Sequence, residues 1–325
     1  VPGTVNLPLL DTDQRRLVGT TYRHEGSEAA IALGHRLVGG ATRVERVEGW
    51  IRALGRGPER AVMCARGGLR SRFTADWLAE AGMPVPRVSG GYKAMRQRLL
   101  RALEELPDRI SLVVVHGRTG TGKTEVLRAL EGRAAVIDLE RLANHRGSVF
   151  GALPGGQPPQ ATFENALALE LLRHAEHPER PILVEAESRL VGNRVVPPAF
   201  LRRMGESPIG VVESTLAERV ERIFREYVEE PIRRGTDPSA LREHLDARIV
   251  SIGRRLGDER CRMIRGTLSE AFAQAPLEAA GHAPWIAELL TGYYDPLYAR
   301  HLERHGPRIV RTVSTAQVGA EYATR

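Results

Sequence analysis

One stretch decides the fold of most of this chain: Ile110-Ser111-Leu112-Val113-Val114-Val115-His116-Gly117-Arg118-Thr119-Gly120-Thr121-Gly122-Lys123-Thr124. Its last eight residues match the phosphate-binding pattern G-x-x-x-x-G-K-[ST]. The apolar run before the loop predicts a strand, and the apolar residues after it recur at the spacing of a helix. Strand, loop and helix in this order predict a P-loop at the start of an α/β domain.

The sequence beyond the loop predicts a parallel sheet and then a helical region. Short apolar runs at 135–137, 182–184 and 209–212 alternate with helical patterns, as in a parallel sheet covered on both faces. From about Ser239 onward the chain is expected to be nearly all helix. One apolar stripe there consists of Leu241, Leu245, Ile249, Ile252 and Leu256.

The loop itself supplies the predicted phosphate-binding residues. Its backbone N–H groups can cradle phosphates, Lys123 can reach the terminal ones, and Thr124 offers a hydroxyl to Mg²⁺. An acidic partner is expected where the 182–184 strand ends, at Glu185 or Glu187. Nothing in the pattern identifies the ligand as ATP, since such a loop binds any diphosphate. The predicted phosphate-binding set is Gly117, Thr119, Gly120, Thr121, Gly122, Lys123 and Thr124.

A second anion-binding loop lies near the other end of the chain, at Cys64-Ala65-Arg66-Gly67-Gly68-Leu69-Arg70. Ala61-Val62-Met63 predicts a short buried strand before it, and Phe73, Trp77 and Leu78 predict a helix after it. A nest of N–H groups, the helix N-terminus and the two arginines should lower the pKa of the Cys64 thiol. We therefore predict that Cys64 is a nucleophile, with Arg66, Gly67, Gly68 and Arg70 around its anion. Cys261 lies in a helical pattern and is expected only to pack.

The composition bounds these predictions. The 325 residues can form two domains, and the segment Glu104–Asp108 reads as the linker between domains at 1–105 and 106–325. The formal net charge of +7 favours a polyanionic partner, although arginine-rich composition alone could account for it. Two cysteines exclude a disulfide framework, and we expect no membrane span, no signal peptide and a cytoplasmic location.

Taken together, the motifs resemble the bacterial tRNA 2-selenouridine synthase family, in which a rhodanese-like domain is fused to a P-loop domain. The resemblance rests on the two loops and on further stretches spread along the chain. These are 1–9, 89–93, 142–148, 157–164, 185–189 and Tyr293-Tyr294-Asp295-Pro296-Leu297-Tyr298. It implies a rhodanese-like parallel-sheet domain, whose first strand would be missing here, followed by a P-loop NTPase-like α/β domain with a helical C-terminal part.

The resemblance also implies an activity. The family is a transferase that replaces the sulfur of 2-thiouridine at tRNA wobble position 34 with selenium, in tRNAs for Lys, Glu and Gln. The sulfur is first geranylated with geranyl diphosphate, which the P-loop and Lys123 would hold. Selenophosphate, from a supplying enzyme, then donates selenium by way of Cys64. The family pattern has an acidic residue where Ala186 stands, which leaves Glu185 and Glu187 as the acidic candidates.

Recognition of tRNA is less specific in the sequence. Tyr293, Tyr294 and Tyr298 could stack on bases, but packing in a core is the favoured interpretation, and a satisfied surface side chain is favoured for His145. A basic surface for phosphates is expected from the arginines at 189, 194, 202, 203, 219, 222, 225, 233 and 234.

Other functions stay open at this point. The main alternative is an ATP-dependent rhodanese-type sulfurtransferase acting on RNA or a small molecule. A non-catalytic nucleotide switch would not need both Cys64 and Lys123, and a small-molecule kinase would leave the cysteine loop unused.

Overall fold

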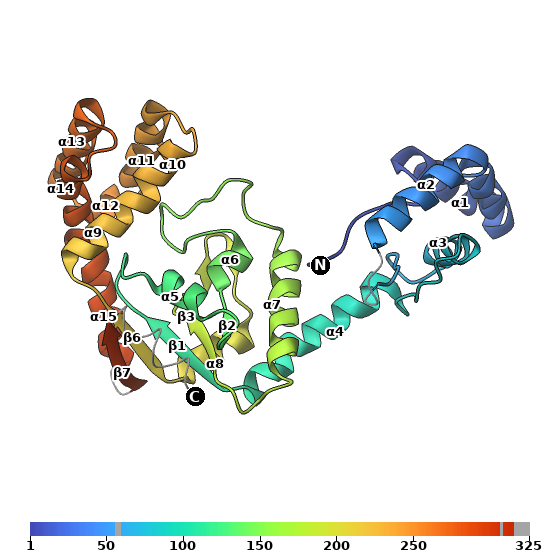
Figure 1. Ribbon diagram of the computed structural model, residues 1–325, viewed down its shortest axis with the longest axis horizontal. Helices are drawn as coiled ribbons and strands as arrows, with labels where there is room; N and C mark the ends of the chain where they lie inside the picture. Colours follow the sequence, from blue (N-terminus) through green and yellow to red (C-terminus); the bar gives the residue numbers. More distant parts are fainter. Residues whose placement is uncertain (56–59, 306–307, 315–325) are drawn as a thin grey trace. The chain divides into compact units, whose positions relative to one another are not determined.

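The computed structural model describes residues 1–55, 60–305 and 308–314. The chain divides into two compact units, Val1–Arg101 and Ala102–Arg325 (Figure 1).

A parallel sheet forms the centre of the second unit. Its strands run in the order β2-β3-β1-β6-β7, so that β1 lies in the middle. Register pairs Leu112 with Ile182 on one side of β1 and Val114 with Ile209 on the other. The strands are β1 (Leu112–His116), β2 (Ala135–Ile137), β3 (Ile182–Glu185), β6 (Ile209–Glu213) and β7 (Ile309–Ser314).

The predicted strand–loop–helix order is confirmed. β1 is mostly buried and its carboxyl end leads into the phosphate-binding loop, which is followed by α5 (Lys123–Leu130). Val126, Leu127 and Leu130 of α5 are buried against the sheet. Because β1 is central, its neighbours β3 and β6 bring their own carboxyl ends to the same edge as the loop.

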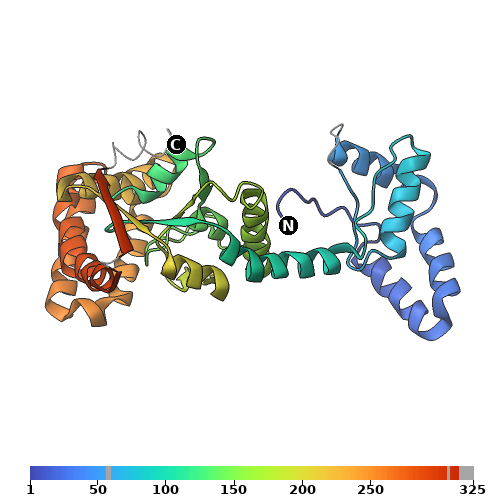
Figure 2. The same ribbon diagram turned by 90° about the horizontal axis from the view of Figure 1, so that it is seen from below.

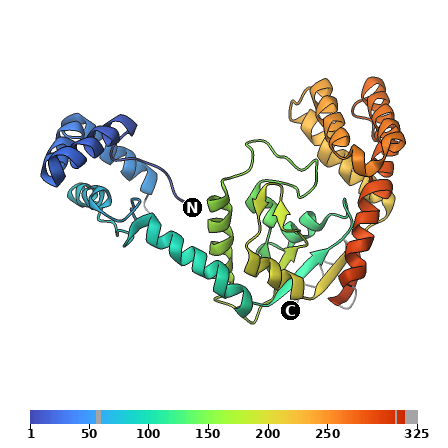
Figure 3. The same cartoon turned by 180° about the vertical axis from the view of Figure 1, so that it is seen from behind.

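Helices follow β6 and gather on the β6 and β7 side of the sheet (Figures 1 and 3). The predicted apolar stripe is confirmed as buried, although α11 ends at Ser251 and a second short helix carries Leu256. Two turns in this region are π-helical, η2 (Arg225–Glu229) and η3 (Leu290–Tyr294). The α-helices are α9 (Leu216–Phe224), α10 (Glu230–Arg233), α11 (Pro238–Ser251), α12 (Gly253–Leu256), α13 (Asp258–Gln274), α14 (Ala279–Leu289) and α15 (Asp295–His305).

The expectation of nearly all helix after Ser239 was wrong in one respect. The chain returns to the sheet as β7, which pairs with β6 in parallel. The six residues of β7 do not alternate between apolar and polar, so the usual sequence signal of a strand is missing there. The remaining elements of this unit are η1 (Leu106–Arg109), α6 (Leu139–Ala143), α7 (Gln160–His174), β4 (Leu190–Val191), β5 (Arg194–Val195) and α8 (Pro198–Glu206).

The first unit is helical. It contains α1 (Thr12–Leu37), α2 (Gly40–Leu54), α3 (Leu69–Glu80) and the first turns of α4 (Gly91–Glu105). Figure 2 shows α1 as two arms that meet at a sharp bend, where Gly26 has a φ of 88°. Trp50 of α2 stacks on Trp77 of α3 in the core of this unit.

The parallel sheet predicted for this unit is not seen among its described residues, and the rhodanese-like fold stays a prediction. Val62 forms only an isolated parallel bridge with Arg87, and Ala61 is exposed, so the buried strand predicted at 61–63 was wrong. An extended segment needs partner strands on both sides to be buried.

The segment expected to link the two domains is helical. Glu104 and Glu105 belong to α4, and Pro107 is buried in η1 rather than exposed in a loop. Proline is tolerated there because it lies in the first turn of the short helix. Within the part of the chain that the structure describes, no helix has the length and apolarity to cross a membrane.

Candidate functional site

A cavity of about 520 Å³ opens at the carboxyl edge of the central sheet, and the P-loop forms one wall of it. The other walls come from the segments 145–148 and 185–188, from α9 and from the two π-helical turns. Segments from well-separated parts of the second unit therefore surround one space. Glu185, Glu187 and six of the seven predicted phosphate-binding residues line it; Thr121 is buried behind the loop.

The glycines shape the loop. Gly120 and Gly122 both have a φ of +82°, a conformation that strains other residues. A Cβ on Gly117 would come within 2.7 Å of the Val212 carbonyl oxygen, so only glycine fits between the loop and β6. Lys123 Nζ donates to the Gly117 carbonyl at 2.9 Å. Burial lowers the pKa of Lys123, while Glu140, Glu187 and Glu185 oppose that shift.

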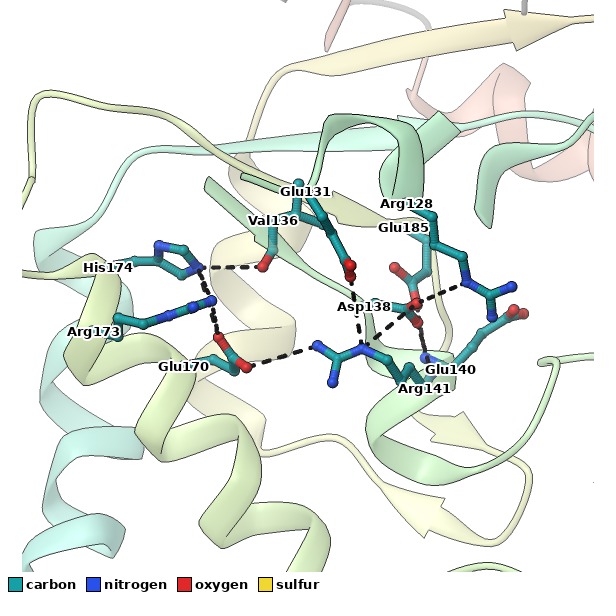
Figure 4. A network of polar contacts seen from close by, with 10 residues as sticks. All are labelled: Arg128, Glu131, Val136, Asp138, Glu140, Arg141, Glu170, Arg173, His174 and Glu185. Carbon is teal, nitrogen blue, oxygen red and sulfur yellow. Dashed lines mark hydrogen bonds and ion pairs between the residues drawn. The ribbon is translucent and has the colours of Figure 1, made fainter. Parts of the chain in front are cut away.

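The side chain of Thr124 is engaged by a carboxylate that sequence reasoning missed. Its hydroxyl donates to Glu140 at 3.1 Å, and the Glu140 backbone N–H donates to Glu185 at 2.7 Å. Glu140 lies in the first turn of α6, two residues after the capping residue Asp138, so the signal was an acidic pair after the 135–137 strand. Figure 4 shows Asp138, Glu140 and Glu185 together with the neighbouring side chains of α5, α6 and α7.

Glu185 is fully buried rather than solvated. Burial, followed by the charge of Asp138, raises its pKa well above the usual carboxyl range. Burial and Glu140 also raise the pKa of Glu187, to about 8, against the opposing effect of Lys123. Within the described ranges no three acidic, histidine or cysteine side chains are arranged to hold a metal ion. The carboxylates of Glu140, Glu185 and Glu187 thus gather around Lys123 and Thr124.

The segment Asn144–Ser148 packs against these carboxylates. Asn144 has a φ of 48° at the end of α6, and its amide donates to the carbonyls of Pro154 and Gly156. A Cβ on Gly147 would lie 2.6 Å from a carboxylate oxygen of both Glu140 and Glu187. Gly147 therefore has no room for a side chain, and the two hydrogen bonds of the Asn144 amide hold the start of the segment.

His145 differs from the expected surface histidine. Its ring lies against the cavity, its Nδ1 is buried without a hydrogen bond among the described residues, and burial lowers its pKa.

The tyrosines divide between core and cavity. Tyr293 is buried in the helical core, which confirms the packing interpretation for that residue. Tyr294 both packs against this core and lines the cavity. Tyr298 lines the cavity and also lies under the guanidinium of Arg118. Burial raises the pKa of Tyr298 to about 12, so its hydroxyl keeps its proton at neutral pH.

Several arginines predicted to form a basic surface are in fact paired. Arg219 is 2% exposed and forms a two-pronged ion pair with Asp295, at 2.6 and 3.0 Å. It also donates to the Thr119 carbonyl of the P-loop at 2.9 Å. Arg222 and Arg225 both pair with Glu125. The prediction was wrong for these three arginines because a count of basic residues does not show which ones meet acidic partners.

The Cys64 loop lies in the first unit and folds as a nest around the sulfur. The Ser71 hydroxyl oxygen lies 3.3 Å from the Cys64 Sγ and 3.1 Å from the Gly68 carbonyl oxygen, and its single proton can be donated to either of them. Burial alone would raise the pKa of Cys64. Hydrogen bonds from the Ser71 hydroxyl and from the backbone N–H groups of Ser71, Arg66 and Gly68 outweigh that effect and lower it to about 7.

Glycines also hold this loop in place. A Cβ on Gly91 would come within 2.1 Å of the Cys64 carbonyl oxygen, and one on Gly67 would meet Gly90 and Gly91 at 2.8 Å. The first N–H groups of α4 donate to the carbonyls of Cys64 and Ala65. Arg66 and Arg70 are exposed at the rim. The lowered pKa comes from hydrogen bonds, including that of Ser71, which the predicted site omitted.

Comparison with known proteins gives one consistent result. A family model described as the tRNA 2-selenouridine synthase AAA domain matches residues 110–325. A protein named tRNA 2-selenouridine synthase from Hahella chejuensis is 44% identical, over 99% of this chain and 86% of its own length. Proteins of the same name from Cupriavidus pinatubonensis (42%, covering 95% and 86%) and Shewanella loihica (40%, covering 100% and 90%) are similar along comparable lengths. With a matching α/β domain and relatives this similar along almost all of its sequence, the chain belongs to the tRNA 2-selenouridine synthase family.

Proposed function

We propose that this protein is a tRNA 2-selenouridine synthase that exchanges the sulfur of 2-thiouridine at wobble position 34 for selenium, in tRNAs for Lys, Glu and Gln. The observation that carries the proposal is the presence of two separate anion sites within one family member. One is the P-loop cavity, and the other is the nest around Cys64. We expect the reaction to take place in the cytoplasm, with a separate enzyme supplying selenophosphate.

The first step uses geranyl diphosphate at the P-loop. The thiocarbonyl sulfur attacks C1 of the geranyl group, the C1–O bond breaks, and diphosphate leaves while N3 of the base loses its proton. The loop N–H groups and Lys123 hold the departing diphosphate. Lys123 now bonds the Gly117 carbonyl, and it would exchange this neutral partner for a charged one.

An apolar crevice supports a prenyl rather than a nucleoside diphosphate. It shares Thr119, Ser148, Ile223, Tyr227 and Tyr294 with the P-loop cavity. Its inner lining is almost entirely apolar: Phe150, Leu245, Trp285, Ile286, Leu289 and Leu290. A purine base needs polar partners that this lining lacks. The crevice now has a volume of only about 20 Å³, so a ten-carbon chain enters only if these side chains move apart.

Mg²⁺ would assist by neutralising the diphosphate that leaves. The Thr124 hydroxyl and the Glu140 carboxylate would hold it, since they already lie 3.1 Å apart beside Lys123. Mg²⁺ commonly takes only one or two protein ligands and completes its shell with phosphate oxygens and water.

The second step uses selenophosphate at Cys64. Selenium adds to C2 of the alkylated base, the C2–S bond breaks, and the geranyl thiolate takes up a proton and leaves. Water cleaves the Se–P bond and releases phosphate. The nest that lowers the pKa of Cys64 to about 7 favours an anion at this position, the Cys64 thiolate itself or a selenophosphate held beside it.

The test is a nucleoside analysis by mass spectrometry. The protein is incubated with tRNA containing 2-thiouridine, geranyl diphosphate and selenophosphate. We expect selenouridine with the unchanged protein, the geranylated base alone with Cys64→Ala, and neither with Lys123→Ala. If no modified base forms while ATP is hydrolysed in response to the RNA, the ATP-dependent sulfurtransferase replaces this proposal.

A further inference from the structure

The first unit contains a second cavity, of about 500 Å³, which the reaction described so far does not use. Its lining is mainly apolar and comes from both arms of α1, from α3 and from the segment before α1. The apolar residues that matter most here are Val18, Ile31, Val38, Leu69, Phe73 and Trp77. This volume is in the range of pockets that bind small organic ligands.

The cavity borders the loop that holds Cys64. Arg66 contributes to the lining, and its backbone N–H group donates to the Cys64 sulfur. Arg70 also lines the cavity. Arg15 of α1 is a third guanidinium at the same cavity. None of the three forms an ion pair with any residue that the structure describes. An apolar hollow edged by unpaired cations fits a ligand that joins an apolar chain to anionic groups.

We propose that this cavity receives the prenyl chain of the alkylated wobble nucleoside, while Arg15, Arg66 and Arg70 contact the flanking phosphodiesters. The inference rests on the proposed function, because that reaction creates a ten-carbon chain on an RNA base. Seating the chain here brings C2 of the base towards Cys64 and leaves the C2–S bond at the mouth of the cavity. The unalkylated base has no chain to bury and gains nothing from the cavity.

The cavity thereby gives the Cys64 site its substrate choice. Burying even two methylene groups corresponds to about a tenfold gain in affinity. Contacts between arginines and phosphates add affinity without distinguishing the two forms of the RNA. Selenation would therefore follow geranylation because only the geranylated RNA binds tightly at this site.

The test compares two labelled anticodon stem-loop RNAs, one with 2-thiouridine and one with S-geranyl-2-thiouridine at the wobble position. Their dissociation constants are measured by fluorescence anisotropy without selenophosphate. The measurement is made with and without a saturating, non-reactive analogue of geranyl diphosphate, in which a CH2 group replaces the oxygen bonded to C1, so that the P-loop cavity is filled without alkylation of the 2-thiouridine RNA. We expect the geranylated RNA to bind at least about ten times more tightly in both conditions. If the preference is lost when the analogue is present, the chain binds in the second unit and the inference is overturned.

Neighbouring residues of α1 provide a matched pair of variants. Val18 lines the cavity, whereas Leu17 is half exposed and does not. Val18→Gln should reduce the preference for the geranylated RNA several-fold, and Leu17→Gln should preserve it. Ile31→Gln is the second cavity variant, should Val18→Gln fail to fold by circular dichroism. Arg70→Gln should weaken the binding of both RNAs by a similar factor.

The outcomes separate this inference from the proposed function. Equal binding of the two RNAs by a protein that still forms selenouridine overturns the inference alone. Absence of selenouridine and of geranylated base in the nucleoside analysis overturns the proposed function. A preference that survives in both Val18→Gln and Ile31→Gln places the chain elsewhere and also overturns the inference.

Discussion

Ser71 is buried at the start of α3, and its hydroxyl is the side-chain group that lowers the pKa of Cys64. Replacing it with alanine removes that hydrogen bond but keeps the backbone N–H groups of the nest. We expect Ser71→Ala to move the midpoint of Cys64 alkylation by iodoacetamide from about 7 towards the ~8.5 of a free cysteine. Peptide mass spectrometry after timed alkylation between pH 5 and 10 measures this.

Thr74→Ala is the matched control for that experiment. Thr74 lies on the same helix, and its hydroxyl donates to the Arg70 carbonyl rather than to the sulfur. Its removal should leave the midpoint at about 7. Equal shifts in the two variants would mean that helix stability, not the Ser71 hydroxyl, governs the thiol.

Glu187 makes the stability of the protein depend on pH. Its pKa is about 8 in the folded protein, mainly because of burial, and near 4.5 in the unfolded chain. Between these values the folded state holds a proton that the unfolded state has lost. The free energy of unfolding therefore falls as pH rises from about 4.5 to 8. Glu187→Gln cannot ionise, so its melting temperature should decline less over this window than that of the unchanged protein. If the melting temperatures of the two proteins change equally between pH 5 and 9, the pH dependence does not come from Glu187.

At the scale of elements, the P-loop segment could be predicted from sequence because every part of its signal is local. The pattern, the apolar run before it and the helical spacing after it lie within 21 residues, 110–130. Glu140 and Asp295 could not be found in the same way. They reach the loop from other elements, through Thr124 and Arg219, and such pairings depend on the tertiary fold.

The ion pair between α9 and the start of α15 ties both helices to the P-loop. Asp295→Asn leaves the buried Arg219 guanidinium without its counter-charge, and removal of one partner of a buried pair costs about 3–5 kcal/mol. We expect a loss of this size in the free energy of unfolding, measured by urea denaturation, together with weaker binding of geranyl diphosphate.

Asp246→Asn is the control, and it tests whether the loss of any two-pronged ion pair has the same effect as the loss of the Asp295 pair. Asp246 also makes a two-pronged ion pair, with Arg265 at 2.6 and 2.9 Å, but that arginine is exposed. An exposed pair contributes at most about 1 kcal/mol. Similar losses in both variants would show that the position of Asp295 beside the P-loop is not what matters.

For the whole molecule, the motifs indicated a two-part chain, and the structure divides it into compact units at Arg101 and Ala102. They did not reveal how each unit is built. The expected sheet of the first unit is reduced to one bridge at Val62, because a short apolar run predicts extended backbone but not its partners. The basic surface expected in the second unit is partly neutralised, since sequence shows charge but not pairing.

The separation of the two sites leads to a prediction about the complete reaction. The residues around Cys64 all belong to the first unit, and those around Lys123 all belong to the second. Cys64→Ala therefore retains an intact P-loop site, and Lys123→Ala retains an intact cysteine site. In the proposed reaction the intermediate would be a thioether on RNA, and a thioether is stable in water, so it could pass from one protein molecule to another. A mixture of the two variants should form selenouridine although neither forms it alone.

The double variant Cys64→Ala, Lys123→Ala is the control for this mixture. Combined with either single variant, it supplies neither missing step and should yield no selenouridine. Nucleoside mass spectrometry with limiting tRNA measures all the combinations. If the mixture of single variants accumulates geranylated tRNA and proceeds no further, the intermediate is not released. Both steps would then have to occur on one tRNA that stays bound to one chain. The tRNA would carry the alkylated base from the P-loop site to the Cys64 site without leaving the protein.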